Sequence, residues 1–482
     1  TGDLMSFIIG ANSAVAGGFG VTNSCRLDNP GDGASSPDYL TRTPSGATNQ
    51  KTFTISFWIK RWGLQIGSSQ QQVIGQQASN YFRCMFCHTA GDIIRMYGPS
   101  LDLQTTAIYR DPSAWYHVCL AMDTTQAVEA NRAKLYVNGT QVTSFSTETI
   151  PGQNVDQDWN VAAAIVIGRS GSSGNDGSPS YLSQFVNIDG AALAPTSFGE
   201  FDEDSGVWKP IDVSGLTFGT NGFFLDFADA ADLGDDESGN GNDFVESGIA
   251  AANQATDTPT NNFATLNSIE EDTGKTFTIG NCKQFLTGVS SFTRSTIGAA
   301  SGKWYCEVKL IAGIRAMYGI SSYGSSENSG ANYLGAVGST AVGYSYGVIG
   351  NTGRLYHAGS STASWVSTFG HGDIIMLAMD LDNNKLYFGK NGTWERSGDP
   401  TSGATGTGAY TIVAPSLNGN GFYQFAFGCN STGEDNNSEM NFGNPAFTVS
   451  SGNADGDGYG NFEYAVPSDY FALCTKNLAT YG

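Results

Sequence analysis

The chain has 482 residues, which favours two domains because single hydrophobic cores stop growing at about 250–300 residues. Its formal net charge of −22 argues against nucleic acid and anionic membranes as partners. Only 14% of the residues are charged, so most surface polarity must come from Ser, Thr, Asn and Gly. No run of about 20 apolar residues is present, which predicts no membrane insertion.

The start of the chain, Thr1 to Gly10, has neither a basic segment nor an adequate apolar segment, so no secretory signal is expected. Met5 as the initiator and Thr1 as a processed end both stay open. The eight cysteines are scattered, and several lie in apolar stretches, such as Cys119 and Cys306. We therefore expect buried free thiols and folding in a reducing cytoplasm.

Residues 1–48 form an expected N-terminal arm that is rich in Gly, Ser and Asn, with one strand predicted at 39–42. This arm either docks on a neighbour or completes the first sheet.

A first domain is predicted over residues 49–200 from stretches in which polar and apolar residues alternate. The expected strands lie at 53–60, 115–122, 133–142, 165–168 and 184–190. Asn138-Gly139 predicts a tight hairpin turn. In this order, the stretches FTISFWIK, WYHV, LYVNG and IVIGR resemble the LamG-like, concanavalin A-like jelly roll.

Residues 201–270 are predicted to connect two domains. They begin with an acidic turn, contain one expected strand at 222–227, and end in the polar stretch ATDTPTNNFATLN. An irregular segment of this length is unusual inside a compact domain. We therefore expect it to wrap the first sandwich and then to lead to the second.

A second domain is predicted over residues 271–449, followed by a tail over 450–482 that packs a few apolar residues. The apolar run 374–379 predicts a strand that is buried on both faces. Asp382-Asn383-Asn384 supplies a tight turn, and Asn391-Gly392 is a strong hairpin signal.

These features, together with the stretches GKWYCEV at 302–308, MYGI at 317–320 and GYSY at 343–346, resemble the SPRY family. The resemblance implies a bent antiparallel sandwich that binds ligands through loops at one rim. The predicted fold class is therefore all-β: two tandem antiparallel β-sandwiches, a LamG-like jelly roll and then a SPRY-like sandwich, with essentially no helix.

The sequence as a whole, including the stretches DESGNGNDF and DTPTNNFATLN, resembles a family of bacteriophage structural proteins that is common in marine phages. The resemblance implies a place on a virion.

Three aromatic side chains of the second domain, Tyr333, Tyr356 and Trp365, are predicted to bind a ligand. Aromatic rings stack on the apolar faces of sugars or fill peptide pockets, and the surrounding Gly, Ser and Asn residues offer adaptable hydrogen bonds. The alternative is that these rings belong to the core, since sandwiches bury aromatic side chains.

Two Asp/Asn/Gly loops are candidate calcium sites, because Ca²⁺ takes six to eight oxygen ligands from flexible carboxylates and carbonyls. The expected ligands are Asp235, Asp236, Asn240 and Asp243 in the first loop and Asp455 and Asp457 in the second. Ordinary turns that bind no metal are the alternative reading of both loops.

Three other patterns do not support catalysis. Cys84-Met85-Phe86-Cys87-His88 reproduces a haem-attachment string, but a strand would place its two cysteines on opposite faces. Glu200 to Asp204 invites comparison with glycosidase carboxylates, yet its acids are consecutive and lie in a loop. The histidines show no metal-ligand or Ser-His spacing: His88, His117, His357 and His371. No enzyme is predicted.

The leading functional hypothesis is a non-enzymatic phage virion surface protein, on a tail fibre or similar appendage, that binds host-surface glycans. The alternatives are a capsid decoration or head-fibre protein with a purely structural role and, third, a polysaccharide hydrolase. The expected partners are a host glycan, other virion proteins and further copies of the chain, with a trimer as one option. The expected location is the virion surface, after folding in the host cytoplasm.

Overall fold

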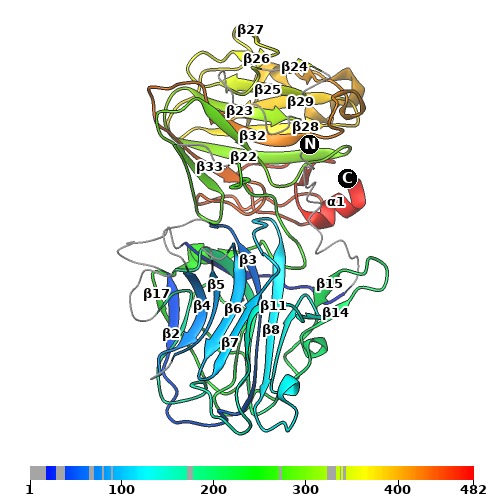
Figure 1. Cartoon of the computed structure of the whole chain (residues 1–482). Helices are drawn as coiled ribbons and strands as arrows, with labels where there is room; N and C mark the ends of the chain where they lie inside the picture. The colour runs from blue at the N-terminus through cyan, green and yellow to red at the C-terminus, as the bar shows by residue number, and fades with distance from the viewer. Residues whose placement is uncertain are drawn as a thin grey trace. The chain divides into compact units, whose positions relative to one another are not determined.

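The computed structural model describes residues 18–28, 38–64, 70–78, 81–87, 91–170, 177–270, 274–322, 333–336, 338–339 and 343–482. These residues divide into two compact units, the first within Val15–Asn261 and the second comprising Asn262–Gly482. Each unit is built from antiparallel sheets (Figure 1). In the described part of the chain, no helix has the length and apolarity needed to cross a membrane.

One sheet of the first unit, the β3 sheet, has the strand order β10-β9-β8-β3-β13-β1-β18, with β16 paired to β13. Its strands are β1 (Ser24–Leu27), β3 (Thr52–Arg61), β8 (Trp115–Asp123), β9 (Ala133–Val137), β10 (Thr140–Gln141), β13 (Ser180–Asp189), β16 (Phe223–Leu225) and β18 (Gln254–Ala255). Asn138 and Gly139 both have positive φ and join β9 to β10, so the predicted hairpin turn is confirmed.

The second sheet of this unit, the β5 sheet, has the order β11-β7-β6-β5-β4-β12-β2-β17. Its strands are β2 (Tyr39–Arg42), β4 (Gln70–Gln76), β5 (Phe82–Cys87), β6 (Ile93–Gly98), β7 (Leu101–Thr105), β11 (Phe145–Thr149), β12 (Ile165–Ile167) and β17 (Val245–Ser247). Side chains from the inner faces of the two sheets form one core, which includes Phe57, Phe185, Phe82 and Cys84. The strands β1 and β2 of the predicted arm lie in the two sheets.

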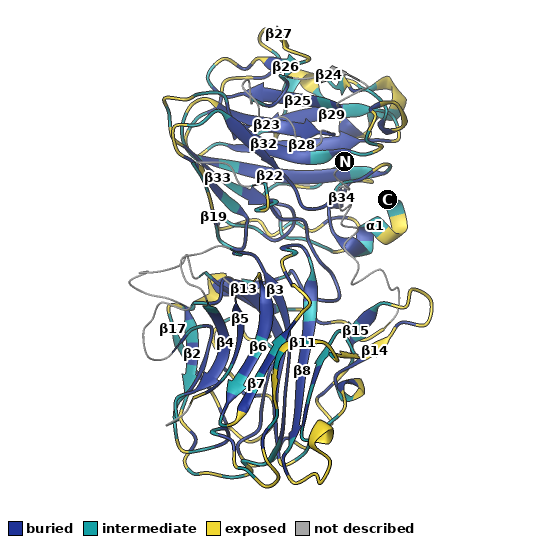
Figure 2. Ribbon diagram, viewed as in Figure 1, coloured by how far each residue is buried: buried dark blue, intermediate teal, exposed yellow. Residues whose placement is uncertain are grey.

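The outer face of the β3 sheet is covered by the chain that follows β13. Phe198, Val213 and Phe218 pack on Cys119 and Val186 of the sheet. A second cluster on the same sheet gathers tryptophans and their neighbours: Trp58, Trp62, Trp115, Tyr181, Trp208 and Ala255. The central strands β3 and β13 are buried along nearly their whole length for this reason (Figure 2).

A buried ion pair joins the β3 sheet to the polar stretch near residue 257. The Nζ of Lys60 lies 2.6 Å from the Oδ2 of Asp257, and both side chains are 0% exposed. The indole Nε1 of Trp115 donates to the other carboxylate oxygen of Asp257 at 2.9 Å. The pair therefore anchors this stretch in the interior of the first unit.

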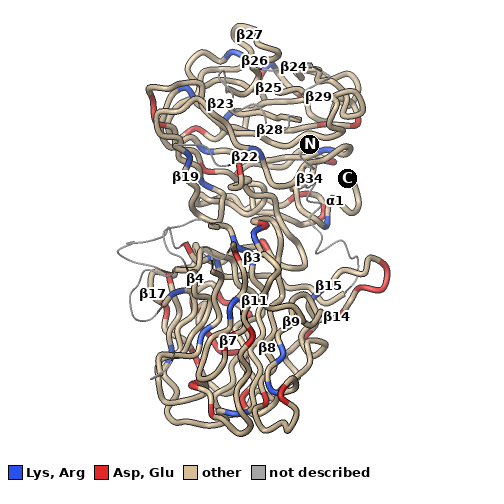
Figure 3. The backbone as a smooth tube through the Cα atoms, viewed as in Figure 1, with Lys and Arg blue, Asp and Glu red and all other residues tan. Residues whose placement is uncertain are grey.

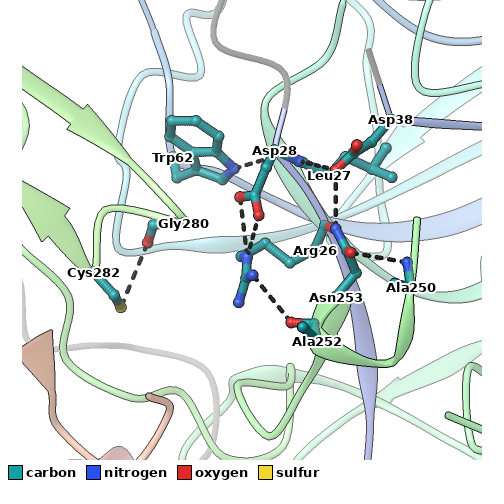
Figure 4. Close-up of polar contacts among 10 residues, drawn as sticks. All are labelled: Arg26, Leu27, Asp28, Asp38, Trp62, Ala250, Ala252, Asn253, Gly280 and Cys282. Carbon is teal, nitrogen blue, oxygen red and sulfur yellow. Dashed lines mark hydrogen bonds and ion pairs between the residues drawn. The ribbon is translucent and has the colours of Figure 1, made fainter. Parts of the chain in front are cut away.

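A further polar cluster ties β1 to the segment before β18 (Figure 4). The guanidinium of Arg26 donates to both oxygens of Asp28 and to the backbone carbonyl of Ala252. The Oδ2 of Asp38 accepts from the backbone N–H of Asp28 at 2.8 Å and from the Nδ2 of Asn253 at 2.9 Å. Burial raises the pKa of Asp38 to about 6.

The second unit is a sandwich of two further sheets. The β22 sheet has the order β19-β20-β33-β22-β28-β29-β30, with β31 paired to β29 and β34 to β22. Its strands are β19 (Lys275–Thr278), β20 (Lys283–Leu286), β22 (Lys303–Ala312), β28 (Ile374–Asp380), β29 (Lys385–Lys390), β30 (Thr393–Trp394), β31 (Tyr410–Thr411), β33 (Asn436–Asn441) and β34 (Phe471–Ala472).

The opposing β23 sheet has the order β21-β32-β23-β25-β26-β27, with β24 paired to β25. Its strands are β21 (Ser291–Arg294), β23 (Ala316–Ser321), β24 (Gly338–Ser339), β25 (Gly343–Ile349), β26 (Leu355–His357), β27 (Ser360–Thr362) and β32 (Gln424–Cys429). The all-β, antiparallel fold class predicted from the sequence is confirmed.

The C-terminal tail forms a second layer on the outer face of the β22 sheet. Phe462, Tyr470 and Cys474 pack against Met376 and Ala378 of β28. Met379 and its alternate neighbours on β28 face the main core of the unit instead. The strand is thus buried on both faces, as its apolar run predicts.

The carboxylate of Glu307 anchors this tail by accepting hydrogen bonds from its backbone. Its carboxylate accepts from the hydroxyl of Tyr305 and the backbone N–H of Tyr464 at Oε1, and from Asn441 Nδ2 and the backbone N–H of Glu463 at Oε2. Burial raises the pKa of this carboxyl. Four donors therefore satisfy a carboxylate inside the unit.

The expectation of essentially no helix is confirmed, because the α-helix of the described residues is one short element, α1 (Thr475–Tyr481). Leu478 and Tyr481, three residues apart, pack against the main core of the second unit. Seven residues hold only two such apolar positions, which is too few to reveal a helical period in the sequence.

Candidate functional site

The outer face of the β5 sheet presents one residue from each of its eight strands in a single row. The strand register aligns Thr149, Asp102, Tyr97, Arg83, Gly75, Val166, Thr41 and Val245. The alternate residues of β5, Phe82, Cys84 and Phe86, point into the core, so Arg83 points outward.

Aromatic rings and planar polar groups gather around the middle of this row. The Cζ of Arg83 lies 5.5 Å from the ring centre of Tyr81 and 5.4 Å from that of Tyr97. The Cζ of Arg95 lies 4.9 Å from the ring centre of the same Tyr97. Tyr81, immediately before β5, is 40% exposed.

Asp102 organises the polar end of the cluster. Arg95 donates to its two oxygens from Nε at 2.8 Å and from Nη2 at 2.7 Å. The Nε2 of Gln104 donates to the same carboxylate at 3.2 Å. We call the set Tyr81, Arg83, Arg95, Tyr97, Asp102 and Gln104 the tyrosine–arginine face. It offers rings for stacking beside groups that make paired hydrogen bonds.

Sequence reasoning missed this face because the stretch YFRCMFCH drew attention to its cysteines. Cys84 lies in the main core, whereas Cys87 packs with Met85 and Ile93 on the other side of the strand. The predicted separation of the two thiols is confirmed, and His88 lies outside the described residues. The alternation of Phe82, Cys84 and Phe86 with Arg83 was the signal for an outward guanidinium.

All eight cysteines are buried, and none of them is in a disulfide. Burial raises the pKa of the Cys84 and Cys119 thiols well above the ordinary range, so neither is a thiolate at neutral pH.

The three predicted aromatic side chains of the second unit do not form one site. The rings of Tyr333 and Tyr356 meet edge to face at 5.5 Å and pack on Leu334. Trp365 belongs to the main core cluster, where its ring meets that of Tyr410 at 5.1 Å. All three are half-buried.

Trp365 and His357 both contact the ring of Tyr410. His357 stacks on Tyr346 with ring centres 4.2 Å apart, and it also neighbours Tyr410. Its Nδ1 lies 3.1 Å from the backbone carbonyl of Ser345, which must accept, so Nδ1 carries the proton. Burial lowers the pKa of His357.

The polar side chains of the first predicted calcium loop are held by hydrogen bonds to the loop itself and to residues 219–224. Asp236 accepts at Oδ1 from the backbone N–H groups of Phe224 and Ser238, and at Oδ2 from the Ser238 hydroxyl and the backbone N–H of Asn242. Asp243 accepts from the backbone of Asp236. Asn240 donates its amide to two backbone carbonyls, those of residues 219 and 222, and Asp235 is exposed.

The second predicted loop is organised in the same way. Asp455 accepts from the backbone N–H groups of Asp457 and Tyr459 at Oδ1, and from Ala472 N–H and Asn477 Nδ2 at Oδ2. Among the described residues, no three His, Cys, Asp or Glu side chains are grouped to hold a metal ion. In each loop, donors from the protein occupy both oxygens of the central aspartate, Asp236 or Asp455, which a cation would need.

Replacing Asp236 by Ala should lower the free energy of unfolding of the first unit by at least about 2 kcal/mol, because several buried donors lose a charged acceptor. The matched control Asp235→Ala removes an exposed neighbouring carboxylate and should have little effect. Denaturant unfolding measures both variants, with and without a calcium chelator. A midpoint of the unmodified chain that falls with the chelator would contradict this account.

The acidic turn at residues 200–204 lies at the hairpin of β14 (Gly199–Phe201) and β15 (Trp208–Pro210). Asp202 accepts from the backbone N–H and hydroxyl of Ser205 and from Lys209, and these bonds lower its pKa to about 2. Glu200 is exposed and pairs with Lys209 at 3.3 Å. A glycosidase acid needs a raised pKa, which is the opposite of what Asp202 has.

The sequence matches the family model of the Concanavalin A-like lectin/glucanases superfamily over residues 33–191. No curated protein gives a significant match. Among solved structures, the SPRY domain of human HERC1 is 13% identical, with 36% of this chain and 96% of that chain covered and a TM-score of 0.26.

Two other solved structures are similar at the same level. A heptameric SAP-like pentraxin from Limulus polyphemus is 15% identical, with 36% of this chain and 80% of that chain covered and a TM-score of 0.28. A candidate carbohydrate-binding protein from Bacteroides ovatus is 15% identical, with 48% and 60% covered and a TM-score of 0.30. The match over residues 33–191 shows that this part of the chain is similar to the concanavalin A-like superfamily, in agreement with the resemblance seen in the sequence.

Proposed function

We propose that the chain is a non-enzymatic glycan-binding protein and that the tyrosine–arginine face is its binding surface. One observation carries the proposal: this outward sheet face combines tyrosine rings with a bidentate Arg95–Asp102 pair and Gln104. Rings stack on the apolar faces of sugars, and planar groups with two donors or acceptors match neighbouring hydroxyls. The outer face of the β3 sheet is unsuited because its own chain covers it.

The match to a superfamily of lectins and glucanases supports a carbohydrate ligand for this unit. Between binding and hydrolysis, the acidic turn favours binding, because Ser205 and Lys209 engage the Asp202 carboxylate and Lys209 also pairs with Glu200. The virion setting rests on the resemblance of the sequence to phage structural proteins. We place the chain on the surface of a phage tail fibre or similar appendage, where it recognises host-surface glycans.

A glycan array with the purified chain tests this function. We expect selective binding, and a loss of about tenfold or more in affinity for Tyr97→Ala, because stacking contributes roughly 0.5–1.5 kcal/mol beyond area burial. Since Tyr97 is half-buried, the more exposed Tyr81→Ala serves as a second variant that keeps the fold.

Trp365→Ala is the matched control, because it removes a half-buried ring from the second unit. If the folded Tyr81 and Tyr97 variants bind as tightly as the unmodified chain, this surface is not the binding site. If the folded chain binds no glycan at all, a purely structural role as a capsid decoration or head-fibre protein takes its place.

A further inference from the structure

We propose that the glycan bound at the tyrosine–arginine face carries an anionic substituent, a carboxylate, sulfate or phosphate, and that Arg83 and Arg169 bind it. This inference rests on the proposed function and narrows its ligand class. The whole chain is strongly acidic, and its charged residues are sparse along the backbone (Figure 3).

The charge balance of the face follows from the strand register. Arg83, Arg95 and Asp102 lie on its outward positions. Glu246 of β17 pairs with Leu40 and lies at an inward position, whereas Glu148 is exposed on the edge strand β11. Asp102 is neutralised by Arg95.

Arg83 differs from the paired arginines of the same unit. Arg26, Arg61 and Arg95 each form an ion pair with an aspartate. Among the described residues, the guanidinium of Arg83 has no carboxylate within ion-pair distance, and its buried Nε has no hydrogen-bond partner. The guanidinium of Arg83 lies beside the rings of Tyr81 and Tyr97.

Arg169 repeats this arrangement across the sheet. It follows β12, and its Cζ lies 3.6 Å from the ring centre of Tyr39 on β2. Leu40 points into the core, so Tyr39 and the Arg169 guanidinium above it belong to the outer side of the sheet. No described carboxylate pairs with Arg169, and its Nε is also buried without a partner.

The positions between the two guanidinium groups are filled, because Gly75 and Val166 are both buried. Gly75 of β4 is the neighbour of Arg83 in the row, and Val166 of β12 follows it. A Cβ on Gly75 would come within 2.6 Å of the Gln72 Nε2, which is engaged with the backbone carbonyl of Arg169. An extended ligand that reaches both cations therefore lies over the Gln72 side chain and not on the backbone of β4.

Contact with tyrosine rings prepares each guanidinium for an oxyanion. A ring next to a guanidinium restricts its rotation without using its N–H donors. These donors match the two oxygens of a carboxylate, sulfate or phosphate in bidentate geometry. Two cations held in this way without acidic partners indicate that the ligand supplies the negative charge.

The test compares affinities on an array that pairs uronic, sialylated, sulfated and phosphorylated glycans with their neutral counterparts. We expect the acidic member of the preferred pair to bind at least tenfold more tightly, with a preference that weakens as salt rises. Arg83→Gln should remove most of that preference, and Arg83→Lys should retain part of it because the charge remains without the planar fork.

Arg110→Gln is the matched control, since it removes an equal charge from an exposed position between β7 and β8 of the same unit. Equal binding of acidic and neutral members, or an unchanged preference in Arg83→Gln, would overturn the anionic ligand while the glycan-binding function stands. No binding to any glycan would overturn both.

Discussion

Acidification from pH 7 to pH 4 should lower the free energy of unfolding of the first unit by about 3 kcal/mol through His117 alone. His117 is fully buried, and burial lowers its pKa from 6.5 to about 3. The indole Nε1 of Trp208 donates to its Nδ1 at 3.0 Å, so the proton sits on Nε2, which lies 2.8 Å from the Ser56 hydroxyl. A charged ring would direct a second N–H at the indole donor.

The loss of stability on acidification follows from the pKa values of His117 in the unfolded and the folded chain. Above about pH 6.5 the ring is neutral in both the folded and the unfolded chain, and the full stability is present. As the pH falls toward 3, only the unfolded chain gains the proton, so the stabilisation is lost progressively. Denaturant unfolding at several pH values, followed by the fluorescence of the tryptophans in the first unit, measures the loss.

The control for this prediction is His117→Gln, which keeps hydrogen-bonding groups but does not titrate. Carboxylates also weaken the fold in acid, and the difference between the two proteins isolates the histidine. An identical pH dependence of the unmodified chain and the variant would show that His117 does not stay neutral in the folded state.

Asp257→Ala should destabilise the first unit by about 3–5 kcal/mol, because it leaves a buried ammonium without its counter-ion. Lys60 is 0% exposed, and the Trp115 indole N–H loses its acceptor at the same time. The double variant Lys60→Met with Asp257→Asn removes both charges and should recover most of this loss. Unfolding by denaturant at neutral pH provides the comparison.

Asp156→Ala is the matched control, since Asp156 pairs with Lys51 of the same unit at 3.6 Å on the surface. Exposed pairs contribute little, so its midpoint should stay close to that of the unmodified chain. If Asp257→Ala is as stable as Asp156→Ala, the buried pair does not anchor the stretch near residue 257.

The strands could be predicted from the sequence because their alternation is local. The predicted strand 53–60 lies within β3, and 374–379 lies within β28. The positive φ values of Asn391 and Gly392 confirm the turn that this dipeptide predicts. In each case, neighbouring residues alone carry the signal.

The candidate site depended on information that the sequence does not hold locally. Tyr356 and His357 are neighbours on β26, yet they face opposite sides of the β23 sheet, so only one of them can lie near Trp365. Which face carries the ligand depends on what covers each sheet, and distant segments decide that. The covering of the β3 sheet by Phe198 and Phe218 is one such case.

The two predicted calcium loops show why residue type alone does not identify a metal site. Asp236 and Asp455 are of a residue type that binds calcium, but backbone N–H groups donate to their carboxylate oxygens. Both arrangements use the same residue types, because Asp and Asn serve turns as readily as cations. Only the positions of the donors separate the two readings.

The most direct test of the central claim is side-chain footprinting of the full chain, with and without a glycan that binds in the array. The tyrosine–arginine face predicts that the bound glycan protects Tyr81 and Tyr97 from modification, while Trp365 and Tyr356 keep their reactivity. Protection of Trp365 or Tyr356, with Tyr81 unchanged, would contradict the account and move the binding site to the second unit.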